Sequence, residues 1–296
     1  MNLKNLIGTG VAIVTPFRQD RSVDFHALGN LIEYQISNHI NYIVVLGTTG
    51  ESVTLTKDEK QAVINYVLET VNSRVPVVVG IGGNNTYDIT EQIRKQDFDG
   101  LEAILSVSPY YNKPSQKGIY EHYKTIASES PVPVILYNVP GRTGKNICSS
   151  TAIELAKISN IIGIKEASCD IEQITEICKN TPDDFLVISG DDAYTLPIIA
   201  IGGHGVISVT ANAFPKEFSE MVQHALNHDF KAASKVHYSL TDIMKYHFIE
   251  GNPAGVKASL SIMKRLDYNL RLPLVPMSDE NYNQLKQYIC QLGYSI

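Results

Sequence analysis

Eight short apolar runs recur along the chain and constrain its fold more than any other feature. Their residues are nearly all apolar and do not alternate with polar ones, which is typical of strands buried on both faces of a parallel sheet. They begin at residues 11, 42, 75, 103, 134, 161, 185 and 205, so consecutive runs start 20 to 33 residues apart. The predicted strands are Val11–Thr15, Tyr42–Leu46, Val75–Ile81, Ala103–Val107, Val134–Tyr137, Ile161–Lys165, Phe185–Ser189 and Gly205–Val209.

Helix start signals lie between these runs. Thr56 with Glu59 and Thr151 with Glu154 have the spacing of a capping box, and Asp170 precedes Gln173 in a similar N-cap pattern. One strand and one helix per unit, repeated eight times, predict an α/β fold of the (β/α)8 TIM barrel type. The alternative is a doubly wound sheet, but segment 80–85 lacks the third glycine of a dinucleotide-binding loop.

The strand pattern stops near residue 228. Residues 229–296 are predicted to be helices, interrupted at Gly251–Pro253 and at Pro273 and Pro276. No low-complexity linker precedes them. We therefore expect a catalytic barrel over residues 1–228 and a C-terminal helical extension over 229–296 that packs on it.

Composition excludes several classes of partner. The 296 residues carry 25 Lys and Arg against 31 Asp and Glu, a net charge of −6, which offers no global basic surface for nucleic acid or an anionic membrane. No apolar stretch reaches the length of a membrane span, and the N-terminus lacks the apolar core of a signal peptide. The four cysteines form no C-x-x-C pair, which favours free thiols and a cytoplasmic location.

Three motifs resemble known functional motifs but lack residues that those motifs require. Segment 141–146 lacks residues of a phosphate loop, and segment 50–54 lacks the final glycine of a nucleophile elbow. His224 and His228 are four residues apart, but no third ligand is evident. We therefore predict no metal site.

Active sites in barrels of this type lie at the C-terminal ends of the strands, and Lys165 is the most informative residue there. It follows the apolar run Ile161–Ile164. A lysine desolvated in such a setting has a lowered pKa, and its neutral amine can attack a carbonyl to form a Schiff base. The alternative is a lysine whose ammonium reaches solvent from a strand end.

A phenol is predicted beside this amine. Tyr137 ends the strand that neighbours the strand of Lys165, and adjacent strands lie about 4.8 Å apart. A tyrosine so placed can move protons during Schiff-base chemistry, and Thr48 and Tyr111 could extend it into a chain of hydroxyls. The alternative for Tyr137 is a packing role at the barrel rim.

Other strand-end residues suit carboxylates. Thr48 and Thr49, on a glycine-flanked turn, offer hydroxyl and backbone N–H donors, although they could serve the turn alone. Arg142 offers a planar fork for a second carboxylate, or it is a surface arginine. Glu166 should point away from Lys165, because successive side chains of a strand face opposite sides.

Together these motifs resemble the 4-hydroxy-tetrahydrodipicolinate synthase (dihydrodipicolinate synthase) family. That family belongs to the pyruvate-dependent Schiff-base aldolases, with N-acetylneuraminate lyase, and the likeness covers essentially the whole chain. It rests on GTTGES at 47–52, SPYYNKP at 108–114, YNVPGRTG at 137–144, GIKEAS at 163–168, SGDD at 189–192 and GGHGVISVTAN at 202–212.

The resemblance implies a lyase that condenses pyruvate with L-aspartate 4-semialdehyde, the first committed step of diaminopimelate and lysine biosynthesis, without cofactor or metal. By match, Lys165 forms the Schiff base, Tyr137 transfers protons, and Thr48 and Tyr111 relay them. Tyr111 comes from a neighbouring subunit in the family, which implies a homo-oligomer, commonly a homotetramer built from dimers. The matching substrate-binding residues are Thr49, Arg142, Gly190 and Ile207.

The family's lysine-inhibited members have an allosteric pocket at a subunit interface. The matching residues here are Ser52, Lys57, Lys60, Asn84, Asp88 and Tyr110. Lys57 and Lys60 stand where sensitive bacterial members often carry histidines, and Asp88 stands for a glutamate. Because added positive charge should repel a bound lysine, we expect weak or absent feedback inhibition.

Three other functions are disfavoured by the sequence. A sibling aldolase acting on a sugar acid or another 2-keto acid is disfavoured by Arg142 and the Thr48–Thr49 pair. A metal-dependent lyase or hydrolase using Glu51 and Asp191 lacks histidine ligands at strand ends. A non-catalytic scaffold would have no need of a buried amine beside a phenol.

Overall fold

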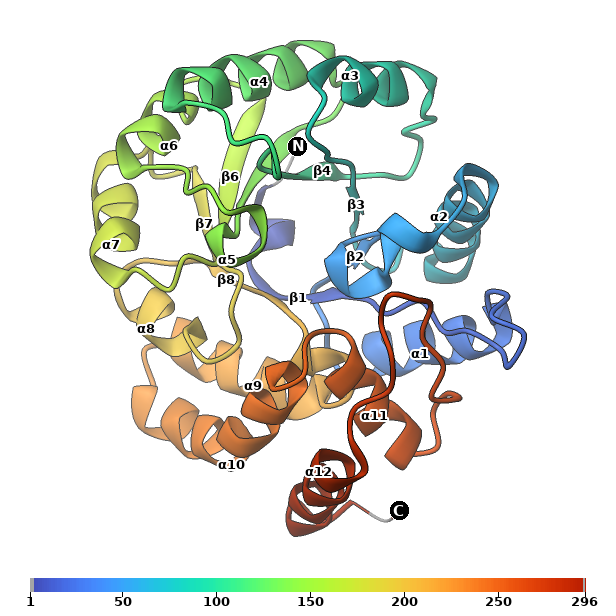
Figure 1. Cartoon of the computed structure of the whole chain (residues 1–296). Coiled ribbons are helices and arrows are strands. Elements are labelled where there is room, and N and C mark those ends of the chain that lie inside the picture. Colours follow the sequence, from blue (N-terminus) through green and yellow to red (C-terminus); the bar gives the residue numbers. More distant parts are fainter. Residues whose placement is uncertain (1–2, 295) are drawn as a thin grey trace.

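A closed barrel of eight parallel strands forms the centre of the protein (Figure 1). The computed structural model describes residues 3–294 and residue 296. Each strand pairs in parallel with the next, and β8 closes the barrel on β1 through the pair Gly10 and Ile207. The predicted (β/α)8 fold is therefore confirmed. The strands are β1 Gly8–Ala12, β2 Tyr42–Val45, β3 Val77–Gly80, β4 Ala103–Val107, β5 Val134–Asn138, β6 Ile161–Glu166, β7 Leu186–Ser189 and β8 Gly205–Ser208.

Helices surround the barrel and alternate with its strands (Figure 1). They are α1 Phe25–Ser37, α2 Lys57–Val71, α3 Thr86–Lys95, α4 Gln116–Glu129, α5 Pro140–Thr143, α6 Ser149–Leu155, α7 Ile171–Asn180, α8 Thr195–Ala200 and α9 Pro215–Leu226, followed by α10 Phe230–Phe248, α11 Ala254–Ile262 and α12 Asp279–Gln291. Four 3-10 helices complete the chain: η1 Leu3–Leu6, η2 Thr48–Gly50, η3 Ser52–Thr54 and η4 Thr210–Asn212.

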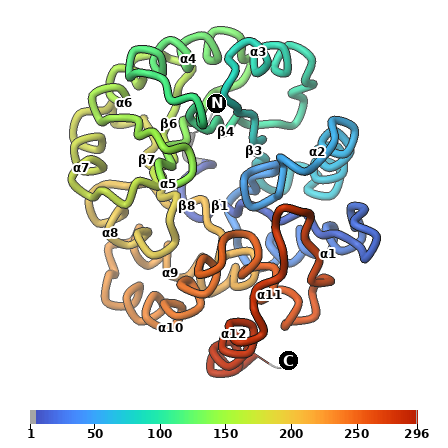
Figure 2. The backbone as a smooth tube through the Cα atoms, in the orientation of Figure 1, coloured from blue at the N-terminus to red at the C-terminus, as the bar shows by residue number. Residues whose placement is uncertain are grey.

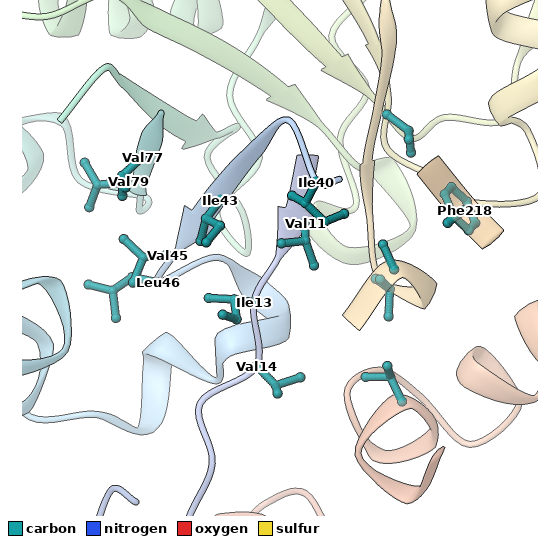
Figure 3. Close-up of a cluster of buried hydrophobic side chains, with 14 of the residues drawn as sticks. Val11, Ile13, Val14, Ile40, Ile43, Val45, Leu46, Val77, Val79 and Phe218 are labelled. Atoms are coloured by element: carbon teal, nitrogen blue, oxygen red, sulfur yellow. The ribbon is translucent and has the colours of Figure 1, made fainter. Parts of the chain in front are cut away.

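The strands are buried on both faces, as their apolar runs predicted. Alternate residues contribute to two different hydrophobic clusters, because successive side chains of a strand point to opposite sides. Ile43 and Val45 belong to the large cluster between the barrel and its helices (Figure 3), whereas Tyr42 and Val44 belong to a smaller cluster inside the barrel. Both clusters are shielded from water, which leaves the strand ends as the place where polar side chains can gather.

The predicted strand bounds are close to the observed ones except at β1. Val11–Thr15 was expected, but the strand runs from Gly8 to Ala12. Its two glycines obscured the apolar pattern, and Gly10 is there for a packing reason. A Cβ at Gly10 would lie 2.3 Å from the ring of Tyr42, which fills this part of the barrel interior.

Two of the three predicted helix caps are confirmed. Thr56 and Glu59 form the capping box of α2, and Asp170 accepts a hydrogen bond from the backbone N–H of Gln173 at the start of α7. The capping box at Thr151 was wrong, because α6 already begins at Ser149. The hydroxyl of Thr151 instead donates to Gln116 Oε1 at 2.7 Å, a tertiary partner that local spacing could not reveal.

The C-terminal helices pack on the barrel as a helical extension (Figure 2). The expected interruptions are observed, since α10 ends at Phe248, α11 begins at Ala254, and residues 263–278 separate α11 from α12. Leu240, Met244 and Leu285 join the same hydrophobic cluster as the barrel helices. Because that core is continuous, the division at residue 228 stays a prediction.

Two smaller points concern the surface. Among the described residues, no helix is both long enough and apolar enough to cross a membrane. His224 lies in the last turn of α9, but His228 lies beyond it with a backbone φ of 62°, so the two histidines do not share a helical face as their spacing suggested.

Candidate active site

Lys165 and Tyr137 lie side by side at the C-terminal ends of β6 and β5. The two residues are register partners in the parallel pair, and Lys165 Nζ lies 4.4 Å from the centre of the Tyr137 ring. Lys165 is 5% exposed and Tyr137 is 7% exposed. The predicted meeting of amine and phenol is thus present in the fold.

Burial changes the acid–base behaviour of Lys165. It lowers the pKa of the ammonium to about 8, since a charged group loses hydration in the barrel. The negative charge of Asp192 opposes this change, and the positive charge of Arg142 adds to it. A substantial fraction of the amine is therefore neutral near physiological pH and able to act as a nucleophile.

The pKa of Tyr137 is shifted in the opposite direction. Burial raises the pKa of its phenol, whereas the charge of Arg142 and the nearby side chain of Thr48 oppose the rise. The phenol therefore keeps its proton in the resting site. A neutral phenol beside a neutral amine can both give and accept a proton as an imine forms.

The turn after β2 supplies two threonines in different environments. Thr48 is exposed at the start of η2, whereas Thr49 is buried, with 2% of its surface exposed. The side-chain amide of Asn252, from the segment between α10 and α11, donates from Nδ2 to Thr49 Oγ1 at 2.9 Å. Sequence reasoning missed Asn252, which was interpreted only as part of a helix break.

Arg142 lies on α5, the one-turn helix that follows β5. Its side chain is exposed, and its charge acts on both Lys165 and Tyr137. Figure 1 shows α5 over the middle of the barrel, where the strand ends converge. An exposed guanidinium in this place can hold an incoming carboxylate.

Gly190 directly follows β7, and Ile207 lies on the adjacent strand β8. A Cβ at Gly190 would lie 2.8 Å from Ala167 Cβ and 3.1 Å from Lys165 Cγ, so only glycine lets β7 end this close to the lysine. Ile207 is fully buried in the cluster inside the barrel that also contains Tyr137. Gly190 thus lies beside Lys165, and Ile207 belongs to the same part of the barrel interior as Tyr137.

Asp192 is a second residue that sequence reasoning missed. It is 1% exposed, and its carboxylate accepts hydrogen bonds from the backbone N–H of Val209 at 3.2 Å and of Thr210 at 2.7 Å. Burial raises its pKa, while hydrogen bonding from Thr210 opposes the rise. The SGDD segment after β7 was the available signal, but the sequence did not show which aspartate turns inward.

Glu51 and Asp191, the acidic residues considered for metal binding, have other partners. The Glu51 carboxylate forms a fully buried ion pair with Lys257, and Asp191 Oδ1 accepts a hydrogen bond from the backbone N–H of Ala193 at 3.0 Å. Glu166 accepts hydrogen bonds from Asn138, Ser168 and Gln173 on the outer side of β6. The expected outward direction of Glu166 is therefore confirmed. Within the described residues, no group of three His, Cys, Asp or Glu side chains is arranged to hold a metal ion.

Tyr111 does not join Lys165 within one chain. Its side chain is 89% exposed in the loop after β4, and its backbone has a φ of 68°, which few non-glycine residues adopt. A single chain therefore contains Lys165, Tyr137 and Thr48 in one region but leaves the second tyrosine facing solvent.

The predicted lysine-pocket residues lie on neighbouring segments after β2, β3 and β4. Ser52 is partly buried in η3, Lys57 is exposed, and Lys60 is half-buried one turn further along α2. Burial and the charge of Lys57 lower the pKa of Lys60. The remaining members are exposed: Asn84, Asp88 and Tyr110.

A family model described as the dihydrodipicolinate synthetase family matches residues 5–292. The chain belongs to this family.

Individual relatives agree over nearly the full length. The chain is 50% identical over 290 residues to the 4-hydroxy-tetrahydrodipicolinate synthase of Parabacteroides distasonis, covering 98% of each chain. It resembles the chloride-inhibited dihydrodipicolinate synthase from Acinetobacter baumannii, solved with pyruvate, at 39% identity and a TM-score of 0.95, covering 98% of this chain and 99% of that one. A lysine-bound enzyme from Cyanidioschyzon merolae is 36% identical with a TM-score of 0.94, at the same coverage.

Proposed function

We propose that this chain condenses pyruvate with L-aspartate 4-semialdehyde to give 4-hydroxy-tetrahydrodipicolinate, as its relatives' names describe. The observation that carries the proposal is the buried Lys165 amine, whose pKa is lowered to about 8, beside the Tyr137 ring at the end of the barrel. Family membership and the close relatives support the same lyase activity. The reaction belongs to the pathway that makes diaminopimelate and lysine.

The chemistry proceeds through an imine on Lys165. Its neutral Nζ attacks the C2 carbonyl of pyruvate, and loss of water gives the protonated imine. A proton leaves C3 to form the enamine, whose C3 attacks the aldehyde carbon of the semialdehyde. The amine of that substrate then adds to C2, the ring closes, and Lys165 leaves. The protonated imine is the electron sink, so the residues present account for every step.

Tyr137 and its neighbours move the protons in this scheme. The phenol gives and takes protons at the imine, and the nearby side chain of Thr48, exposed on its turn, is the next hydroxyl of the relay. We assign Tyr111 of a neighbouring subunit to the next position in this relay, since Tyr111 is 89% exposed in the single chain. The active unit is then at least a dimer, and we propose a homotetramer built from dimers.

Two carboxylates are bound at separate places. Thr49, the backbone at Ile207 and the space left by Gly190 hold pyruvate near Lys165, and the exposed guanidinium of Arg142 holds the carboxylate of the semialdehyde. The free thiols of all four cysteines suit a cytoplasmic enzyme, which is the location we propose.

Borohydride trapping tests this function. The full-length protein is incubated with pyruvate and borohydride, and the adduct is mapped by mass spectrometry of peptides. We expect a reduced pyruvyl adduct on Lys165 and none on Lys257, a second buried lysine whose pKa is also lowered to about 8 but whose charge is paired with Glu51.

The acceptor is then identified by steady-state comparison of aldehydes. We expect aspartate semialdehyde to exceed any sugar aldehyde in kcat/KM, and Lys165→Arg to lose both adduct and activity. An absent adduct at saturating pyruvate would overturn the Schiff-base assignment. Equal activity with a sugar aldehyde would overturn only the substrate.

A further inference from the structure

Residues of the C-terminal extension form hydrogen bonds with the turn that carries Thr48 and Thr49. Figures 1 and 2 show the red chain after α11 beside the blue segment that follows β2. The Arg271 backbone N–H donates to Glu51 Oε2 at 3.1 Å, and the Arg271 guanidinium donates to the carbonyl oxygen of Thr54 at 2.9 Å. A segment more than 200 residues away in sequence thus fixes the position of this turn.

A buried ion pair anchors the end of the turn. Glu51 follows η2 in the left-handed backbone region, at a φ of 52°, and its carboxylate accepts a hydrogen bond from Lys257 Nζ on α11. Both side chains are fully buried, and Lys257 Nζ also donates to the carbonyl oxygen of Asn269 at 3.0 Å. With both charges removed from water, each needs the other in place, so the turn cannot shift without separating them.

Asn252 contacts Thr49, which lies two residues before Glu51 in the same turn. A threonine hydroxyl has one O–H to donate and two lone pairs that accept. Asn252 Nδ2 occupies a lone pair of Thr49 Oγ1, and in the described part of the chain the hydroxyl donates to no protein acceptor. Its proton therefore remains available to a ligand, and a carboxylate, which can only accept, is the group that it suits.

Burial of both side chains keeps the donor and acceptor roles in this hydrogen bond fixed. Asn252 is 6% exposed and Thr49 is 2% exposed, so water has little access to either group. The Asn252 Oδ1 atom is buried without a hydrogen-bond partner among the described residues. The donation to Thr49 is thus the single side-chain hydrogen bond that Asn252 makes with another described residue.

We propose that Asn252 is a positioning residue, which fixes the Thr49 hydroxyl as a hydrogen-bond donor to the carboxylate of the 2-oxo acid. The proposal rests on the function proposed above, because it takes pyruvate as the ligand beside Lys165. Among the described residues, the Asn252 side chain donates to Thr49 and to no group of Lys165 or Tyr137, so it acts through Thr49. It should therefore govern pyruvate binding more than the chemical step.

The test measures pyruvate saturation of the borohydride-trapped adduct, together with steady-state KM and kcat. For Asn252→Ala we expect the half-saturating pyruvate concentration to rise about tenfold, the size typical of a hydrogen bond to a charged group, with a smaller change in kcat. For Asn252→Asp, which has the same shape, we expect a larger rise. Its carboxylate would accept the hydrogen bond that the Thr49 hydroxyl otherwise donates to the substrate, and it would repel the substrate carboxylate.

A double-mutant cycle separates positioning from general stability. In a Thr49→Val background, Asn252→Ala should change pyruvate saturation little, because the hydroxyl it orients is gone. Asn283→Ala, on the exposed face of α12, is the matched control and should behave as the unaltered protein. Thermal unfolding of each variant shows whether it is folded.

The outcomes are distinguishable. Equal effects of Asn252→Ala with and without Thr49, or unchanged pyruvate saturation in Asn252→Asp, would overturn this inference while leaving the Schiff base intact. Failure of the unaltered protein to form an adduct would overturn the proposed function instead.

Discussion

At the scale of single residues, the site depends on one amine in an unusual environment. The apolar run before Lys165 already indicated desolvation, and the neighbouring strand indicated Tyr137. The fold adds two opposing charges: Asp192 favours the ammonium, and Arg142 disfavours it. Burial is the largest influence on the pKa of Lys165, and it therefore sets the fraction of the amine that is neutral and nucleophilic.

The pH dependence of trapping follows from this environment. Because the pKa of Lys165 is lowered to about 8, only about one amine in a hundred is neutral two pH units below that value. The rate of pyruvyl adduct formation should therefore rise with pH and level off above about 8. Single-turnover trapping across the pH range measures it, and a rate that is flat from pH 6 to 9 would contradict the assignment.

At the scale of elements, helix α2 and the strand ends beside it form the predicted allosteric lysine pocket. The capping box at Thr56 was predictable because both partners lie within one turn. It begins α2 directly before Lys57, so that Lys57 and Lys60 follow one turn apart on the same side of the helix. Burial and the charge of Lys57 lower the pKa of Lys60, which indicates that the two ammonium groups disfavour each other.

Weak inhibition by L-lysine is the expected consequence. A bound lysine would bring a further ammonium to this end of α2, and like charges repel. Activity should fall by less than half when L-lysine is present at the concentration of saturating pyruvate, with D-lysine as control. The double variant Lys57→Ser and Lys60→Ser should be inhibited more strongly. Strong inhibition of the unaltered protein would show the hypothesis to be wrong.

At the scale of the whole molecule, closure of the barrel gathers strand ends from the entire sequence. Residues from β2, β5, β6, β7 and β8 meet at one edge, and the extension reaches back to the turn after β2. Tyr111 is the exception, because its exposed side chain has no place in this edge within one chain. The proposed relay is therefore complete only in an oligomer.

Mixing two inactive variants tests the shared site. Lys165→Arg chains keep Tyr111, and Tyr111→Phe chains keep Lys165, so a hybrid dimer holds one intact site if Tyr111 serves its partner. After unfolding and refolding of an equal mixture, about a quarter of the sites should be intact, and activity should recover accordingly. Activity no greater than the average of the two variants refolded separately would place Tyr111 outside the partner's site.

Local patterns in the sequence were enough to predict much of this protein. Burial on both strand faces leaves an apolar run, and a cap lies within one turn, so the eight strands, the extension and two of three caps could be recognised. The motifs after the strands contained Tyr137, Arg142 and Gly190, which the structure places near Lys165. Their roles remain predictions that the experiments above address.

Tertiary structure decided what depends on partners distant in sequence. Thr151 binds Gln116 instead of capping a helix, Asn252 orients Thr49, and Glu51 is neutralised by Lys257. None of these partners lies within a helical turn or on an adjacent strand, so no periodicity records them. The sequence by itself determined which groups stand at the strand ends, because local hydrophobic pattern and spacing encode the barrel. Only closure of the barrel and docking of the extension decided how each group is oriented and charged, since hydrogen bonds and burial depend on distance in space.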